Sequence, residues 1–221
     1  MHRVADIRWN FIELKASHPN GNAPGSMYEL IGMSFIADAP TIFGEPDESY
    51  IARELAWYHS QSLNVHDIPG GPPPKIWLDV ADVDRNVNSN YGFLIWSKEN
   101  GRQYDEVLKE LLHNPSSRRG AMIYTRPTMH HDAFVNGRSD FVCTNAVNYF
   151  IRDGQLNAVV QMRSNDVVFG YRNDYAWQRY VLQMLANDLN VPAGDIIWNA
   201  ASLHVYPRHH HLIPDKNGAS S

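Results

Sequence analysis

The sequence predicts a single domain of the α/β (α+β) class over residues 1–221. Three stretches repeat apolar residues at helical spacing, and two further stretches flank an Asp-Gly pair that is typical of a tight β-hairpin turn. With 221 residues and 43% hydrophobic composition, the chain can bury one core of ordinary size. Helical and strand-like stretches are mixed along the chain without visible repeats, so we expect one mixed domain.

The helices follow from apolar periodicity. They are expected over about residues 46–62, 102–113 and 174–189. In the first of them, Ile51, Leu55 and Tyr58 share one face, and Pro46 suits the opening position. We interpret the aromatic and apolar residues of all three helices as packing surfaces.

The strands follow from turn signals and apolar runs. They are expected over residues 121–126, 144–152, 155–163 and part of 195–206. Asp153-Gly154 joins the middle two as a hairpin, and a two-residue loop would pair Cys143 with Ser164. A polar, His-rich tail is expected over 207–221.

Composition limits the classes of partner. A net charge of −5 argues against a surface that binds nucleic acid, and no apolar run reaches the ~18 residues of a membrane span. The N-terminus lacks the profile of a signal peptide. A single cysteine permits no internal disulfide, so we expect a cytoplasmic protein without nucleic-acid or membrane partners.

Cys143 is the first candidate for chemistry. The hairpin register sets it opposite Ser164 and beside Arg163. A neighbouring guanidinium favours the thiolate, which is the nucleophilic form of cysteine. The alternative is that Cys143 is a small buried hydrophobe that only packs.

Glu54 is the second candidate, because it lies on the apolar face of the first helix. It is either a group at the helix edge that reaches water or a buried acid with a raised pKa. Of the two, the position at the helix edge is the preferred prediction.

Further polar residues follow in a fixed order along the chain. They are Arg118, Arg119, Arg163, Ser164, Asp166, Gly170, Asp174, His204 and Tyr206. His204 and Tyr206 are two apart on an expected strand, so their side chains share a face. Taken alone, Arg163 could form a surface ion pair, His204 could be a core histidine, and the Arg doublet could be a solvated loop.

In combination these residues resemble the thymidylate synthase superfamily from about Gly32 to His209. The matching segments are Glu54-Leu55 with Trp57, Tyr91-Gly92, Cys143, Asp153-Gly154, Arg163-Ser164 with Asp166, and His204 with Tyr206. The resemblance implies a mixed β-sheet covered by helices, with one sheet face used for a homodimer. It also implies a pyrimidine nucleoside monophosphate as substrate and 5,10-methylenetetrahydrofolate as co-substrate, with no metal.

The resemblance assigns a role to each residue. Cys143 would add to C6 of the pyrimidine, and Glu54 would act in proton transfer through ordered water. Phosphate binding falls to Arg163 and Ser164, joined by Arg118 and Arg119 from the neighbouring subunit. The sugar hydroxyl would be bound by His204 and Tyr206. The folate or other parts of the site would be formed by Asp166, Gly170, Trp77 and Tyr91.

Asp174 departs from thymidylate synthases, which have a base-reading asparagine at this position. An Asp carboxylate can accept from the 4-amino group of cytosine, and a proton shared with N3 completes the pair. The resemblance is therefore to the cytidylate 5-hydroxymethylase branch, in which water rather than hydride completes the reaction. We expect CMP as the favoured substrate and dCMP next. Alternatively, Asp174 is an N-cap or first-turn acid, and Asn173 reads the base.

Two other functions stay open at this level. One is thymidylate synthase-type methylation of UMP or dUMP, which would follow if Asn173 reads the base. The other is a noncatalytic nucleotide- or metal-binding module, with candidate ligands His130, His131, Asp132 and His209 to His211. Two departures from the family are the lack of arginine in loop 18–26 and Thr144 where many relatives have histidine.

Overall fold

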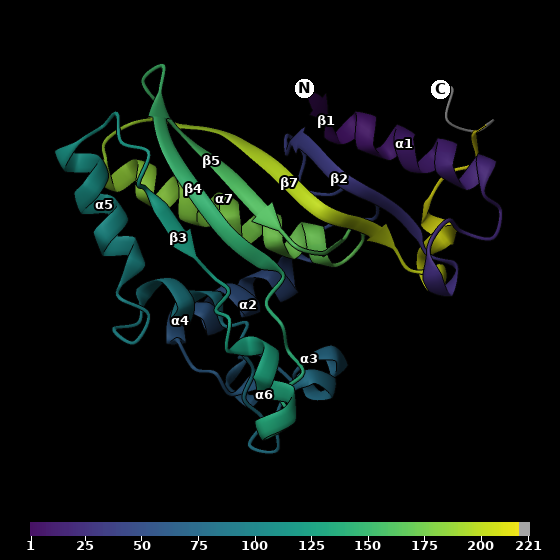
Figure 1. The fold of residues 1–221 in the computed structure, drawn as a ribbon, viewed down its shortest axis with the longest axis horizontal. Helices are drawn as coiled ribbons and strands as arrows, with labels where there is room; N and C mark the ends of the chain where they lie inside the picture. The colour runs from purple at the N-terminus through teal and green to yellow at the C-terminus, as the bar shows by residue number, and fades with distance from the viewer. Residues whose placement is uncertain (217–221) are drawn as a thin grey trace. The chain divides into compact units, whose positions relative to one another are not determined.

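The computed structural model describes residues 1–216, which fall into two compact units (Figure 1). The first unit combines the chain up to Pro46 with the chain from Arg152 onward, and the second runs from Asp47 to Ile151. The expectation of one domain over the whole chain stays a prediction. Part of the predicted polar tail, residues 217–221, lies outside the described residues.

The first unit is built on a mixed sheet with strand order β1-β2-β7-β5, and a short strand, β6, also pairs with β7. Its strands are β1 (His2–Arg3), β2 (Tyr28–Ile36), β5 (Gln155–Met162), β6 (Asn165–Asp166) and β7 (Ala193–Val205). β2 runs antiparallel to β7, whereas β5 and β6 run parallel to it. Its helices are α1 (Val4–Ser17) and α7 (Gly170–Asp188), with 3-10 turns at Pro24–Ser26 and Pro207–Leu212.

One face of this sheet is covered by α7, which runs along β5 and β7 (Figure 1). Alternate residues of the strands point into this layer because side chains two apart share a face. Fully or almost fully buried members of the core are Leu156, Ala158, Val160, Trp177, Val181, Leu185 and Trp198. The predicted packing face of the third helix is therefore confirmed at its centre.

The opposite side of the sheet carries a row of half-buried apolar residues. Ile36 of β2, Ile197 of β7 and Val159 of β5 are direct neighbours across three strands. We call this row the open sheet face. In the part of the chain that the structure describes, no helix has the length and hydropathy of a membrane span.

The Asp153-Gly154 turn forms as predicted. The strand before it, β4 (Thr144–Arg152), ends at Arg152, and β5 begins at Gln155. Both turn residues have positive φ, 53° at Asp153 and 77° at Gly154. That pair of values is typical of a type I′ turn, which two-residue hairpin loops prefer.

The second unit is mostly helical. Its helices are α2 (Glu48–Ser60), α3 (Lys75–Val80), α4 (Tyr91–Trp96), α5 (Gln103–His113) and α6 (Met129–Asn136), with a 3-10 turn at Val65–Asp67. β3 (Ala121–Ile123) pairs antiparallel with β4. The Asp47 side chain caps α2 by accepting from the Tyr50 backbone N–H at 3.0 Å, which supplies a partner to an otherwise unpaired donor.

Most predicted elements are confirmed, with shifted ends. α2 and α5 match their predicted ranges to within two residues. α7 begins at Gly170 rather than 174, and β3 ends at Ile123 rather than 126. The prediction omitted α1 and β2, although Val4, Ile7 and Phe11 do have helical spacing and are buried.

The contact between α2 and α4 depends on a glycine. A Cβ added at Gly92 would lie 1.9 Å from the backbone oxygen of Tyr58. The helices could not stay at this separation, and overpacking of this kind costs about 1–3 kcal/mol or more. We therefore expect Gly92→Ala to lower the free energy of unfolding by about 3 kcal/mol, measured by denaturant titration.

The control is Ala56→Gln, which enlarges an exposed position of α2 and should change stability little. Equal stability of Gly92→Ala and the native protein would contradict the close approach of the two helices.

Candidate active site

Glu54 is a buried acid on α2. Its side chain is 5% exposed, so the preferred prediction of a water-exposed helix edge is wrong and the buried alternative is correct. Burial raises the pKa of the Glu54 carboxyl to about 7, while hydrogen bonds from Tyr50 and Tyr58 act in the opposite direction. A carboxyl with this pKa can both release and take up a proton near neutral pH.

Two aromatic side chains hold Glu54 in place. The Tyr50 hydroxyl donates to Glu54 Oε1 at 2.9 Å, and Trp77 Nε1–H donates to the Tyr50 oxygen at 2.8 Å. Tyr50 precedes Glu54 by one helical turn, so α2 itself sets their separation. Trp77 was a predicted site residue, whereas Tyr50 was missed. The four-residue spacing of Tyr50 and Glu54 could have identified it.

A second set of contacts leads from Glu54 towards Cys143. Tyr58 hydrogen-bonds Glu54 and stacks on Tyr91, with ring centroids 5.4 Å apart. Thr144 Oγ1 donates to the Tyr91 hydroxyl at 3.1 Å. Three predicted site residues of the second unit, Glu54, Trp77 and Tyr91, therefore belong to one connected group of side chains. The group ends at Thr144, which directly follows Cys143 in the chain.

Cys143 is partly exposed and lies immediately before β4. It is therefore not the fully buried packing residue of the alternative interpretation. The predicted pairing of Cys143 with Ser164 joins residues of different units and stays a prediction.

The predicted phosphate and sugar residues of the first unit surround β6. Arg163 and Ser164 connect β5 to β6, and the register of β6 on β7 places Asp166 opposite His204. His204 and Tyr206 have ring centroids 5.0 Å apart, as expected for side chains on one face. The structure therefore brings these residues together.

His204 is a buried histidine whose surroundings favour the neutral imidazole. Its side chain is 6% exposed, and burial is the main cause of its lowered pKa. Asp166 and Glu29 act in the opposite direction, whereas the charge of Arg163 lowers the pKa further. A neutral histidine offers one donor and one acceptor, which suits a sugar hydroxyl.

Asp174 lies in the second turn of α7. The helix begins at Gly170 and its N-cap is Phe169, so the alternative that Asp174 is an N-cap or first-turn acid is wrong. Asn165 Nδ2 donates to Asp174 Oδ2 at 2.8 Å. Asp166 shapes the entry to the helix by accepting from the backbone N–H groups of Val168 and Phe169 at 3.1 and 3.2 Å.

Arg118 and Arg119 lie in the exposed segment between α5 and β3. Arg119 donates from Nη2 to both carboxylate oxygens of Glu110 at 2.9 Å. This pairing fixes the side chain against its own unit, while Arg118 is exposed.

The histidine-rich segments pack against aromatic or polar neighbours. The ring centroids of His130 and Phe141 lie 4.7 Å apart, and those of His209 and Phe169 lie 4.8 Å apart. Asp132 accepts from Arg126 at 3.1 Å. Within residues 1–216, no three His, Cys, Asp or Glu side chains gather in a way that could hold a metal. The metal-binding alternative therefore has no ligand set in this part of the chain.

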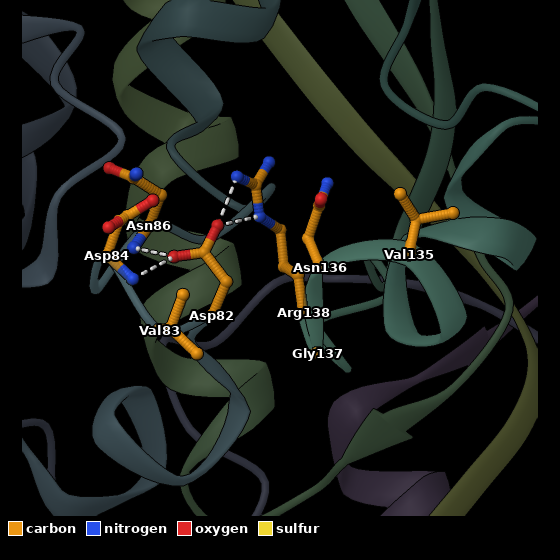
Figure 2. Close-up of a pocket in the computed structure, with 8 residues that line it drawn as sticks. All are labelled: Asp82, Val83, Asp84, Asn86, Val135, Asn136, Gly137 and Arg138. Atoms are coloured by element: carbon orange, nitrogen blue, oxygen red, sulfur yellow. Dashed lines mark hydrogen bonds and ion pairs between the residues drawn. The ribbon is translucent and has the colours of Figure 1, made fainter.

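A separate pocket of about 450 Å³ opens in the second unit (Figure 2). Asp82 and Arg138 form an ion pair along its wall, and Val83 and Val135 border it. None of the predicted site residues lines this pocket. It is a structural feature of the α6 region and not the site of the residues above.

Known proteins resemble this chain in sequence. Residues 48–216 match the thymidylate synthase family. The deoxycytidylate 5-hydroxymethyltransferase of Enterobacteria phage T4 is 59% identical over 192 residues, which cover 84% of this chain and 78% of that protein. The thymidylate synthase of Bacillus licheniformis is 27% identical, over 71% of this chain and 57% of that protein.

Solved structures confirm the predicted fold class. Thymidylate synthase from T4 phage superposes with a TM-score of 0.71 over 93% of this chain and 77% of that chain, at 19% identity. Thymidylate synthase A from Bacillus subtilis gives 0.64 over 83% of this chain and 68% of that chain, at 24% identity. The chain belongs to the thymidylate synthase family.

Proposed function

We propose that this protein transfers a one-carbon unit from 5,10-methylenetetrahydrofolate to C5 of a cytidine monophosphate and releases the 5-hydroxymethyl product. The observation that carries the proposal is Asp174, an acceptor-only side chain where thymidylate synthases read uracil with asparagine. The 59% identity to a protein named deoxycytidylate 5-hydroxymethyltransferase supports it. The sequence favoured CMP, and that relative's name favours dCMP, so both are substrates to test.

Cys143 supplies the nucleophile of the proposed reaction. A pyrimidine C5 is a weak nucleophile until a group adds at C6, and a thiolate can make that covalent bond. The resulting enamine carbon at C5 then attacks the one-carbon unit. C5 loses its proton to a base, and the bond from the transferred carbon to nitrogen breaks, which releases tetrahydrofolate and leaves an exocyclic methylene on C5. Water adds to the exocyclic methylene, and loss of the cysteine from C6 restores the ring.

Glu54 exchanges protons during these steps. Its pKa of about 7 lets the carboxyl act as acid and as base at the same working pH. Burial supplies this property, and the tyrosine donors limit how far the pKa rises. An exposed carboxyl would stay ionised and would return a proton poorly.

Recognition of the nucleotide falls to the residues around β6. Arg163 and Ser164 suit a phosphate, because a guanidinium can bind two phosphate oxygens at once. The neutral His204 and the adjacent Tyr206 suit a sugar hydroxyl. Asp166, Gly170, Trp77 and Tyr91 complete the proposed site as supports of these groups or as contacts to folate.

We further propose a homodimer that forms through the open sheet face. Ile36, Val159 and Ile197 give this face an apolar centre, which a second copy could cover by the same surface. Arg118 and Arg119 would then bind the phosphate held by the partner. The pairing of Arg119 with Glu110 orients its guanidinium before the nucleotide arrives.

The substrate assignment is tested by incubating the protein with methylenetetrahydrofolate and CMP, dCMP, UMP or dUMP in turn. Mass spectrometry of the products should show addition of one carbon and one oxygen to a cytidylate. Cys143→Ser should bind nucleotide but lose turnover by a factor of about 10⁴ or more, because covalent activation is lost.

Methylated uridylate with release of dihydrofolate would overturn the assignment. In that case Asn173, rather than Asp174, would be the base-reading residue. Undiminished turnover by Cys143→Ser would overturn the covalent mechanism for any substrate.

The tyrosine next to Glu54 gives a prediction for pH dependence. Tyr50→Phe removes a donor to the carboxylate, so the ionised form loses stabilisation and the pKa of Glu54 rises. We expect the corresponding limb of the kcat profile to move up by about one pH unit, since a hydrogen bond to a charged group contributes about 1.5–3 kcal/mol. Tyr171→Phe removes a comparable bond to the Ala39 carbonyl and should leave the profile unshifted.

The same carboxyl affects stability. Because its pKa is raised in the folded state, Glu54 stabilises the fold at pH below about 4.5 and loses that contribution as pH rises through about 7. Glu54→Gln should therefore gain stability relative to the native protein by up to about 3 kcal/mol between pH 4.5 and 8. A difference independent of pH, measured by denaturant titration, would contradict the buried acid.

The dimer is tested by Ile197→Arg, which places a charge at the centre of the open sheet face. We expect the native protein to have the mass of a dimer in light scattering and the variant to have the mass of a monomer with reduced turnover. Val83→Arg is the matched control, since Val83 is 87% exposed but lies in the second unit. A native monomer with full activity would contradict the proposal.

A further inference from the structure

Asn165 holds the residue that is proposed to read the base. It is the first residue of β6, its side chain is 2% exposed, and its Nδ2 donates to Asp174 Oδ2 at 2.8 Å. Buried polar groups in native proteins are normally hydrogen-bonded. The hydrogen bond to Asp174 therefore explains why a buried side chain with an amide group can be accommodated at residue 165.

The backbone between these two residues leaves room for their contact. A Cβ added at Gly170 would lie 3.3 Å from Asn165 Nδ2 and 3.9 Å from Asp174 Oδ2. A side chain at residue 170 would thus crowd the amide that reaches the carboxylate. The glycine that opens α7 serves the pairing of Asn165 with Asp174.

The carboxylate determines the orientation of the amide. Asn165 Oδ1 is buried and has no hydrogen-bond partner among the described residues. Turning the amide over would place Oδ1 against Asp174 Oδ2, so that two acceptors would face each other and the N–H₂ group would lose its acceptor. Asn165 is therefore a fixed donor, and it uses the Oδ2 side of the carboxylate.

We propose that Asn165 is a positioning residue for base selectivity, which turns Asp174 so that its second oxygen accepts from the 4-amino group of cytosine. This inference depends on the proposed role of Asp174. An asparagine at residue 174 would turn its own oxygen towards the Asn165 donor. Its amino group would then face the base and would suit O4 of uracil. With a fixed donor at residue 165, Asp at residue 174 would therefore select cytosine and Asn at residue 174 would select uracil.

The experiment compares Asn165→Ala, Asn165→Ser and Asp174→Asn with the native protein. Calorimetry gives the Kd of CMP and UMP, and of dCMP and dUMP, for each variant. Removing the donor should weaken cytidylate binding about ten-fold or more and change uridylate binding little, because a hydrogen bond to a charged group is lost. Asp174→Asn should shift the ratio towards uridylate.

The matched control is Asn157→Ala. Asn157 is also an asparagine of the first unit. It lies on β5, and its Oδ1 accepts from the Asp195 backbone N–H at 2.9 Å. It lies near the opposite end of β5 from β6. This variant should leave the ratio of the two Kd values unchanged, even where it lowers the unfolding temperature. Asn165→Ser serves as the second variant if the alanine protein does not fold.

The outcomes separate the inference from the proposed function. If Asp174→Asn changes the ratio and both Asn165 variants leave it at the native value, Asn165 has no positioning role and the function stands. If Asp174→Asn also leaves the ratio unchanged, Asp174 does not read the base, and both are overturned. A purely structural role of Asn165 would weaken binding of both bases equally.

Discussion

The pairing of the two-residue strand β6 with β7 is the constraint on which the first unit's functional groups depend. Its register puts Asp166 opposite His204, and alternation along the strand sends Asn165 to the other side. From there Asn165 reaches Asp174, while the Asp166 carboxylate accepts the backbone N–H groups that precede α7. A slip by one residue would exchange these two side chains and separate both pairs. The short strand therefore fixes both the residues that are proposed to bind sugar and base and the contacts that precede α7.

In the second unit the corresponding constraint is the burial of Glu54. A buried carboxyl is unfavourable as an ion, and helical spacing alone places Tyr50 and Tyr58 one turn away on either side to donate to it. The two effects oppose each other and leave the pKa at about 7. Trp77 extends the group because its indole N–H donates to the Tyr50 oxygen. Local geometry of one helix thus produces an acid suited to proton exchange at neutral pH.

The sequence predicts those features that local spacing determines. The type I′ turn at Asp153-Gly154 and the range of α2 were both predictable, because turn chemistry and apolar period are local properties. Burial is a tertiary property, so the sequence pattern could not decide that Glu54 is buried. The start of α7 was also set too late, because Asp166 accepts the N–H groups before the helix from a preceding strand. A contact of this kind leaves no periodic pattern of apolar residues in the sequence, so the sequence could not predict it.

Hydrogen-bond polarity explains why Asp174, the proposed base-reading residue, cannot be interpreted alone. A carboxylate and an amide have almost the same shape, and they differ only in that the amide carries two donors. A fixed donor at Asn165 means that residue 174 must offer an acceptor on that side. If residue 174 reads the base as proposed, it presents an acceptor to the substrate when it is Asp and a donor when it is Asn. A buried mismatch of this kind can discriminate by roughly 10⁴-fold or more. In the proposed site, selectivity therefore belongs to the pair of residues, and we expect an exchange of Asp174 to change the preferred base only while Asn165 keeps its donor in place.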